Sequence, residues 1–134
     1  AHGLKPAEKH LVFGGFSRSD GISGLDKLLE QDSLPEIIFA VTYPVALGIL
    51  LRSRELGIRI PGDLDLVCFG NSEYNNLITP SVTGINQPAA EIGTLALTHL
   101  LQQIENPEKA PELNIIVPVE INQGRTCMGP GKKA

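Results

Sequence analysis

The sequence contains few residues of the kinds that build metal centres and disulfide frameworks. Its 134 residues include two cysteines, Cys68 and Cys127, and three histidines, His2, His10 and His99. Two cysteines are too few for a disulfide-stabilised domain, and the scattered histidines complete no metal-ligand spacing. We therefore expect no metal and no cofactor. The cysteine usage fits a reducing compartment, and we expect a cytoplasmic protein.

Basic charge and long apolar runs are scarce as well. Lys and Arg number 11 against 15 Asp and Glu, which gives a net charge of -4. Binding of a nucleic-acid backbone needs clustered Lys and Arg, so it is not expected of this segment. No apolar run approaches the ~20 residues of a membrane span, so we expect no membrane partner. Because the chain begins at Ala1 without Met, we treat it as a piece of a longer protein.

The motifs of common enzyme classes are missing too. The stretch "GGFSRSDG", residues 14–21, is not the Gly-x-Ser-x-Gly elbow of a hydrolase, and no motif places a histidine beside it. No lysine of the phosphate-binding type follows a Gly-rich loop, and the glycines lack the dinucleotide-binding spacing. Without a nucleophile–base pair or paired acids, we do not expect an enzyme.

What the chain does have is enough apolar residues for a core, with 42% hydrophobic and 19% charged residues. Its length fits one domain over residues 1–134, with flexible ends at 1–9 and 124–134. Short apolar runs alternate with segments of helical spacing. We predict strands at 11–13, 36–41, 64–70, 83–87 and 114–121, and helices at 19–31, 42–57, 72–78 and 88–106.

The predicted strands are apolar throughout, so both faces of their sheet must be covered. With strands and helices in alternation, this predicts an α/β fold of three layers, α/β/α, around a mainly parallel sheet. Pro118 marks the last strand as an edge or crossing strand. The helix opened by Pro88 is expected to bury one apolar face, formed by Ile92, Leu95, Ala96, His99 and Leu100.

The predicted helix at 42–57 has clear end signals and two apolar stripes, although packing against one sheet face needs only one. Thr42 can cap it, Pro44 suits its first turn, and Gly57 suits its C-terminal end. A second stripe, Leu47 with Leu51, predicts burial against either a second subunit or a neighbouring helix. The stripe expected to face the sheet consists of Ala46, Ile49, Leu50 and Ser53.

In open parallel sheets, ligands bind in the crevice beyond the carboxyl ends of the strands. Four short stretches stand at such ends, and we expect them to converge on one edge. Each also has a purely structural reading, since an aromatic can plug a core, an amide can cap a helix, and Gly-Asn can form a turn. The stretches are Gly14-Gly15-Phe16, Thr42-Tyr43, Gly70-Asn71 and Asn86-Gln87.

The run "IIFAVTYPVALGILLRSRELGIRIPGDLDLVCFGN", followed by "ITPSVTGINQPAAEIG", resembles the lactose-repressor (LacI/GalR) family of bacterial transcription regulators. Upstream, "GGFSRSDGISGLDKLL" is similar to a family stretch, and "VPVEI" resembles its last core strand. The resemblance implies the C-terminal lobe of a type I periplasmic-binding-protein-like effector domain. It also implies a homodimer, a small-molecule effector such as a sugar or sugar derivative, and operator DNA bound through a helix-turn-helix absent here.

The resemblance also implies which residues contact the effector and the second subunit. At two positions where the family usually has a ligand-binding carboxylate, this chain has Tyr43 and Gly70. A carboxylate is a strong acceptor for sugar hydroxyls, so a neutral sugar bound in the usual way is not expected. Tyr43 stacking on a ring, Asn71 as a substitute acceptor, an anionic effector and a lost ligand site all stay open. The implied effector contacts are Phe16, Thr42, Tyr43, Gly70, Asn71 and Gln87, and the implied dimer contacts are Leu47, Leu51 and Ile78.

A solute-binding protein of a sugar transporter shares this fold and is the alternative reading.

Overall fold

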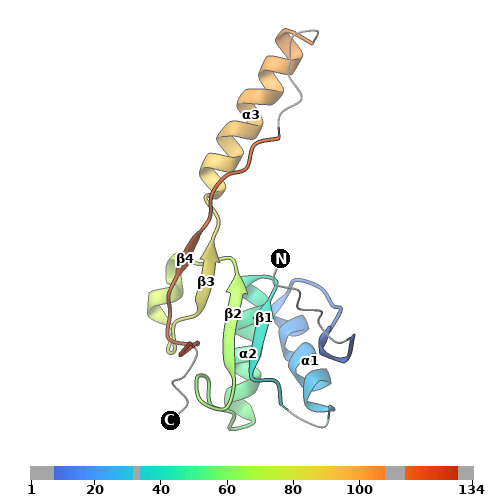
Figure 1. Cartoon of the computed structure of the whole chain (residues 1–134), viewed down its shortest axis with the longest axis vertical. Helices are drawn as coiled ribbons and strands as arrows, with labels where there is room; N and C mark the ends of the chain where they lie inside the picture. The colour runs from blue at the N-terminus through green and yellow to red at the C-terminus, as the bar shows by residue number, and fades with distance from the viewer. Residues whose placement is uncertain (1–7, 32–33, 108–113, 130–134) are drawn as a thin grey trace.

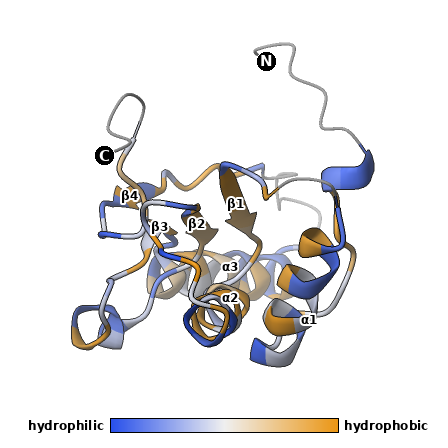
Figure 2. Ribbon diagram, turned by 90° about the horizontal axis from the view of Figure 1, so that it is seen from below, coloured by the Kyte–Doolittle hydropathy of each residue, from blue (hydrophilic) through white to orange (hydrophobic). Residues whose placement is uncertain are grey.

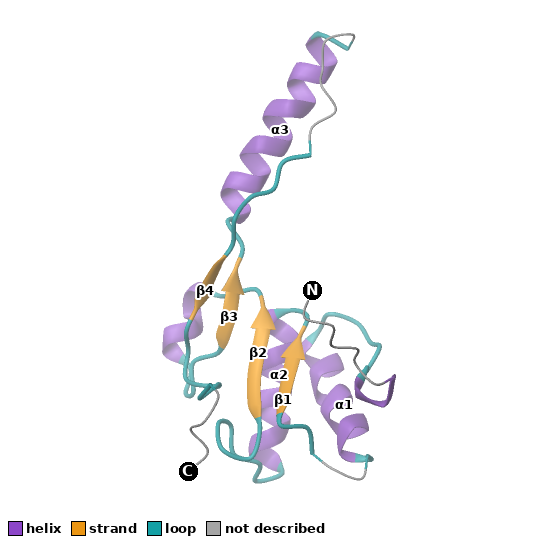
Figure 3. Cartoon of the chain, in the orientation of Figure 1, coloured by secondary structure: helices purple, strands orange, loops and turns teal. Residues whose placement is uncertain are grey.

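The computed structural model describes residues 8–31, 34–107 and 114–129. These residues form one four-stranded sheet with the order β1-β2-β3-β4 (Figures 1 and 3). The elements in chain order are the 3-10 helix η1 (Glu8–His10), α1 (Arg18–Leu29), β1 (Ile37–Ala40), α2 (Tyr43–Glu55), β2 (Asp65–Phe69), the 3-10 helix η2 (Glu73–Leu77), β3 (Thr83–Asn86), α3 (Ala89–Glu105) and β4 (Glu120–Asn122).

The sheet is mixed but mainly parallel, as predicted. β1 pairs with β2 and β2 with β3 in parallel, whereas β4 runs antiparallel to β3 at the edge. β4 lies at the edge, as predicted, but it covers only Glu120–Asn122, so residues 114–119 of the predicted strand form no strand and Pro118 lies outside the ladder.

Of the predicted layers, the described residues contain the sheet and one helix layer, formed by α1 and α2, which covers one face of the sheet. α1 and α2 lie together behind the sheet in the view of Figure 1, and the view from below places both on the same side of the strands (Figure 2). α2 is the helical connection between the parallel strands β1 and β2, and α1, which precedes β1, packs against α2 on the same face.

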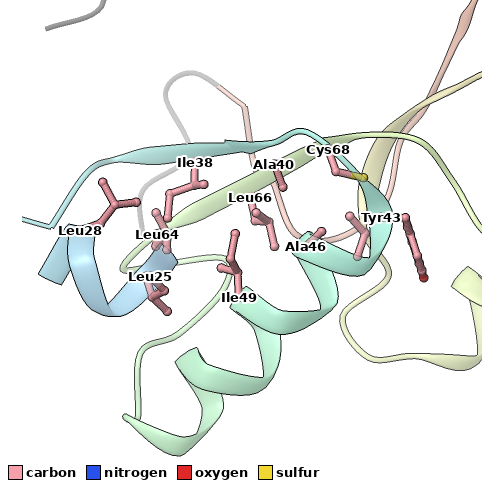
Figure 4. Close-up of a cluster of buried hydrophobic side chains, with 11 residues drawn as sticks. Leu25, Leu28, Ile38, Ala40, Tyr43, Ala46, Ile49, Leu64, Leu66 and Cys68 are labelled. Atoms are coloured by element: carbon pink, nitrogen blue, oxygen red, sulfur yellow. The ribbon is translucent and has the colours of Figure 1, made fainter. Parts of the chain in front are cut away.

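The core lies between this sheet face and the two helices (Figure 4). The predicted sheet-facing stripe of α2 is buried at Ala46, Ile49 and Ser53, while Leu50 is half-buried. The predicted helix ends are also confirmed: Thr42 caps α2, a proline stands in its first turn, and Gly57 follows with a φ of 71°. Side chains that are at most 1% exposed complete the core: Leu25, Leu64, Leu66, Cys68 and Val82.

Helices α1 and α2 approach each other closely through two glycines. A Cβ added to Gly48 would overlap the backbone carbonyl of Arg18, and one added to Gly21 would overlap that of Val45. Both positions therefore require glycine. At the start of α1, Ser17 and Asp20 form a reciprocal capping box. The close packing of the two helices and the capping box together determine where residues 14–17 lie at the start of α1.

The predicted strand at 11–13 does not form. Leu11 donates its N–H to Glu8 in a turn, at 3.0 Å, and the Phe13 side chain is 86% exposed. In the described residues β1 is the sheet edge, and the segment at 10–16 lines a cavity of about 490 Å³ beside it. A strand here would have one neighbour and no covering layer for Phe13, so pairing would bury little apolar surface.

Helix α3 forms as predicted, but none of its residues is buried. Ile92 is 42% and Leu100 52% exposed, while Leu95 and His99 are half-buried and Ala96 is exposed. The prediction of a buried face is therefore wrong for these residues, because α3 extends away from the sheet (Figure 1). No helix within the described ranges is both long enough and apolar enough to cross a bilayer.

Residues 124–129 belong to the C-terminal end that was expected to be flexible, and among them Thr126 is fully buried. Its hydroxyl donates to the carbonyl of Leu66 at 2.7 Å and accepts from the N–H of Thr83 at 2.9 Å. These bonds fasten the segment between the starts of β2 and β3. The remaining terminal residues of that expectation, 1–7 and 130–134, lie outside the described residues, and residues 8–10 form η1.

Candidate functional site

The carboxyl ends of three parallel strands form one continuous edge. Ala40 is the register partner of Cys68, and Phe69 is that of Ile85. The residues that follow these strands, Thr42, Gly70 and Gln87, therefore leave the sheet side by side.

Hydrogen bonds join the segments along this edge. The Thr42 hydroxyl donates to the carbonyl of Phe16 at 3.2 Å, which brings the segment before α1 to the end of β1. The N–H of Gly70 donates to the carbonyl of Ile85 at 2.9 Å. Gly70 has a φ of 115°, in the range that favours glycine. A side chain at this position would therefore strain the backbone.

The edge thus brings together the backbone positions of Phe16, Thr42, Gly70, Asn71 and Gln87. Phe16 is 70% exposed, Gln87 is exposed, and Asn71 is half-buried. An aromatic face and two amides are consequently available to a ligand, whereas the Thr42 hydroxyl is engaged with Phe16. None of these five residues carries an ionisable side chain.

The carboxylate that follows Phe16 most closely along the chain, Asp20, caps a helix. Asp20 accepts from the N–H of Ser17 at 2.9 Å and from the Ser17 hydroxyl. The hydroxyl bond, followed by the backbone bond, lowers the pKa of Asp20. This carboxylate therefore completes the cap of α1 through its Oδ2 atom.

Tyr43 does not face the edge. Its side chain is 9% exposed and belongs to the core cluster (Figure 4). Its hydroxyl donates to Oδ1 of Asn75 at 3.0 Å, and burial, with a smaller contribution from Cys68, raises the pKa of Tyr43. The phenol is thus a neutral buried donor, and the interpretation of Tyr43 as a ring that stacks on an effector has no support in its placement.

Asn75 is the residue that sequence reasoning missed. It is 3% exposed, and its side chain makes hydrogen bonds to Tyr43 and to both backbone groups of Val82. In the sequence it is one of two adjacent asparagines in "EYNNL", and nothing local separates it from Asn76, which is exposed. Its role depends on a partner 32 residues away.

The three implied dimer contacts also converge. Leu47, Leu51 and Ile78 line one cavity of about 480 Å³ between α2 and the segment after η2. We call this cavity the α2 groove. Its other lining residues are mostly apolar: Leu50, Ser53, Arg54, Ile58, Ile60, Leu77, Thr79 and Pro80.

Residues 3–127 match the profile of a family described as periplasmic binding protein-like domain. The chain belongs to this family. Its relatives are LacI-family regulators. It is 31% identical over 119 residues to the catabolite control protein A of Priestia megaterium, covering 89% of this chain and 36% of that protein. It is 35% identical over 102 residues to the ribose operon repressor of Haemophilus influenzae, covering 76% of this chain and 29% of that protein.

Solved structures of LacI regulators share the fold. A LacI-type regulator from Bacillus cereus subsp. cytotoxis superposes with a TM-score of 0.80 at 26% identity, covering 85% of this chain and 40% of that one. A LacI-family regulator from Enterococcus faecium, solved with bound ribose, gives 0.74 at 29% identity, covering 84% and 41%. The chain thus spans about a third of the length of the curated relatives. These relatives are named as control proteins and repressors, not as enzymes.

Proposed function

We propose that this chain is the C-terminal lobe of the effector-binding and dimerisation domain of a LacI-family transcription regulator. The effector, a sugar or sugar derivative, binds between the carboxyl edge of this sheet and a second lobe. Binding favours one arrangement of the lobes, and the dimer passes that preference to DNA-binding headpieces on the same polypeptide.

The observation that carries this proposal is the convergence of Phe16, Gly70, Asn71 and Gln87 on one edge. These residues come from three segments between 16 and 87, and the hydrogen bonds of Thr42 to Phe16 and of Gly70 to Ile85 tie the first two segments to the strand ends. Such an edge offers one side of a ligand site, as expected of one lobe of a two-lobed domain.

The exposed apolar residues of α3 support the proposal that the full-length protein has a second lobe that covers them. Leu97 is 57% exposed and Ile104 67% exposed, and the described part of the chain provides no layer to cover them. An amphipathic helix of 17 residues gains its stability mainly by packing an apolar face. We propose that α3 packs in the second lobe of the full-length regulator, a part of the molecule that this chain does not contain.

The absence of a carboxylate at Tyr43 and Gly70 shapes the expected ligand contacts. An amide presents one acceptor and two donors, so Asn71 and Gln87 can bind hydroxyls without a charged partner, while Phe16 covers a ring face. A solute-binding protein of a transporter has the same fold, but the relatives named above are repressors and control proteins, which favours the regulator.

Calorimetry on the full-length protein tests this function. D-ribose is the first ligand to try, because a related regulator was solved with ribose bound, and a thermal-shift screen of sugars and sugar phosphates extends the search. We expect Phe16→Ala to weaken binding roughly 5- to 10-fold through the lost ring contact. Tyr74→Ala, an exposed aromatic on η2, should leave affinity unchanged. Absence of binding by any sugar or sugar derivative would contradict the proposal.

Sedimentation equilibrium tests the dimer. Leu47→Lys puts a charge into the apolar α2 groove, and we expect it to impair dimerisation of the full-length protein. Leu56→Lys is the control, because Leu56 is 44% exposed at the end of the same helix and does not line the groove. If both variants sediment as the unchanged dimer, the groove is not the subunit contact.

A further inference from the structure

The segment at 70–82 connects the two surfaces of the proposed function. Its first residues, Gly70 and Asn71, lie at the carboxyl edge, and its later residues, from Leu77 to Pro80, line the α2 groove. A backbone bond from Gly70 to Ile85 ties one end. Near the other end, Nη2 of Arg54 donates to the carbonyl of Thr79 at 3.1 Å.

Between these ends the segment is held by one buried side chain, Asn75. Its Oδ1 accepts from the N–H of Val82 at 2.8 Å and from the Tyr43 hydroxyl at 3.0 Å. Its Nδ2 donates to the carbonyl of Val82 at 2.9 Å. Asn75 is 3% exposed and Val82 1% exposed, so water cannot replace these bonds without opening the core.

The backbone of Tyr43, whose hydroxyl bonds to Asn75, is held near the edge by the preceding residue, Thr42. Tyr43 directly follows Thr42, which bonds to Phe16. A continuous path of bonds and adjacent residues therefore runs from Phe16 through Thr42 and Tyr43 to Asn75 and the start of β3. Two side-chain bonds link α2 to the segment at 70–82 in the described residues: the exposed bond of Arg54 to Thr79, and the buried bond of the Tyr43 hydroxyl to Asn75.

We propose that Asn75 is a positioning residue, which fixes Asn71 at the carboxyl edge and Ile78 at the α2 groove through its bonds to Tyr43 and Val82. When ligand binding shifts the carboxyl edge, the hydrogen-bonded segment at 70–82 then moves as a unit and displaces the residues that line the α2 groove. This inference rests on the proposed function for the identity of the two surfaces. The three hydrogen bonds of Asn75, which we call the Asn75 brace, are observed independently of that function.

Hydrogen exchange on the full-length protein without ligand tests the brace. Tyr43→Phe removes one bond and keeps the ring, and Asn75→Ala removes all three. We expect amide exchange in peptides from 70–82 to rise by about tenfold in Tyr43→Phe and further in Asn75→Ala, while peptides from β1 and β2 exchange as in the wild type. Tyr74→Phe, the only other tyrosine and 62% exposed on the same segment, should change nothing.

A second readout separates positioning from plain stabilisation. We expect Tyr43→Phe to weaken self-association in sedimentation equilibrium although Tyr43 does not line the groove. It should also weaken binding of the tightest sugar from the screen, although Tyr43 is buried. A uniform rise of exchange over the whole chain, or unchanged exchange at 70–82, would overturn the inference. Localised exchange in a protein that neither dimerises nor binds a sugar would keep the brace and refute the proposed function.

Discussion

Replacing Gly48 with alanine probes the close packing of α1 on α2, which places Phe16 and Thr42 next to each other. The added Cβ would overlap the carbonyl oxygen of Arg18 and would lie 3.0 Å from the Cα of Gly21. Both neighbours are backbone atoms, so no side-chain rotation relieves the overlap. The two helices must move apart.

The expected loss follows from two opposing contributions. Overpacking in a well-packed core costs typically about 1–3 kcal/mol, and a backbone overlap belongs at the upper end. Alanine in a helix recovers about 1 kcal/mol relative to glycine. We therefore expect a net loss of about 2 kcal/mol in the free energy of unfolding, and a Tm lower by roughly 6–10 °C for a chain of this size.

Urea unfolding followed by circular dichroism measures this change. Gly93→Ala is the matched control, because Gly93 lies in α3 and a Cβ there would meet nothing within 4 Å. Its stability should stay the same or rise by up to about 1 kcal/mol. A Gly48→Ala variant as stable as the wild type would refute the close approach of the two helices.

Two further predictions concern ionisable groups. Burial raises the pKa of the Cys68 thiol to about 11, so iodoacetamide at pH 8 should modify the partly exposed Cys127 first, and equal labelling rates by mass spectrometry would contradict the burial of Cys68. The Arg59 guanidinium holds the pKa of Asp63 at about 2, below its value in the unfolded chain. Its contribution to stability is therefore present above about pH 4 and is lost as the pH falls through 2. Asp63→Asn should be less stable than the wild type at pH 7, and the difference should shrink as the pH is lowered through 2. A pH-independent difference in urea midpoint would count against this pair.

Local signals in the sequence account for the elements that were predicted correctly. Thr42, Pro44 and Gly57 mark the ends of α2 through capping chemistry, which depends only on neighbouring residues. Apolar runs followed by Gly-Asn or Gln-Pro predicted strands whose carboxyl ends meet, and the parallel register then brings Thr42, Gly70 and Gln87 together.

Long-range packing accounts for the rest. Helical spacing shows that α3 has an apolar face, but it does not reveal whether the partner of that face belongs to the same stretch of chain. The pairing of Tyr43 with Asn75 joins two segments that share no local pattern, so a tyrosine beside a predicted ligand edge was read as a ligand contact. The strand predicted at 11–13 does not form for the same reason: its pairing depends on long-range packing that would cover Phe13, which the local sequence does not reveal.

Tryptophan fluorescence provides the most direct measurement of the central claim, because this chain contributes no tryptophan to the full-length protein, whose wild-type emission is subtracted as background. Phe16→Trp in the full-length protein adds an indole at the carboxyl edge, and Leu56→Trp adds one at the far end of α2, about 20 Å away along a 13-residue helix. The protein is titrated with the sugar that calorimetry shows to bind most tightly. We predict that the emission of Phe16→Trp changes with the calorimetric affinity, while that of Leu56→Trp stays constant. Saturating sugar that leaves the emission of Phe16→Trp unchanged would show that the effector binds elsewhere.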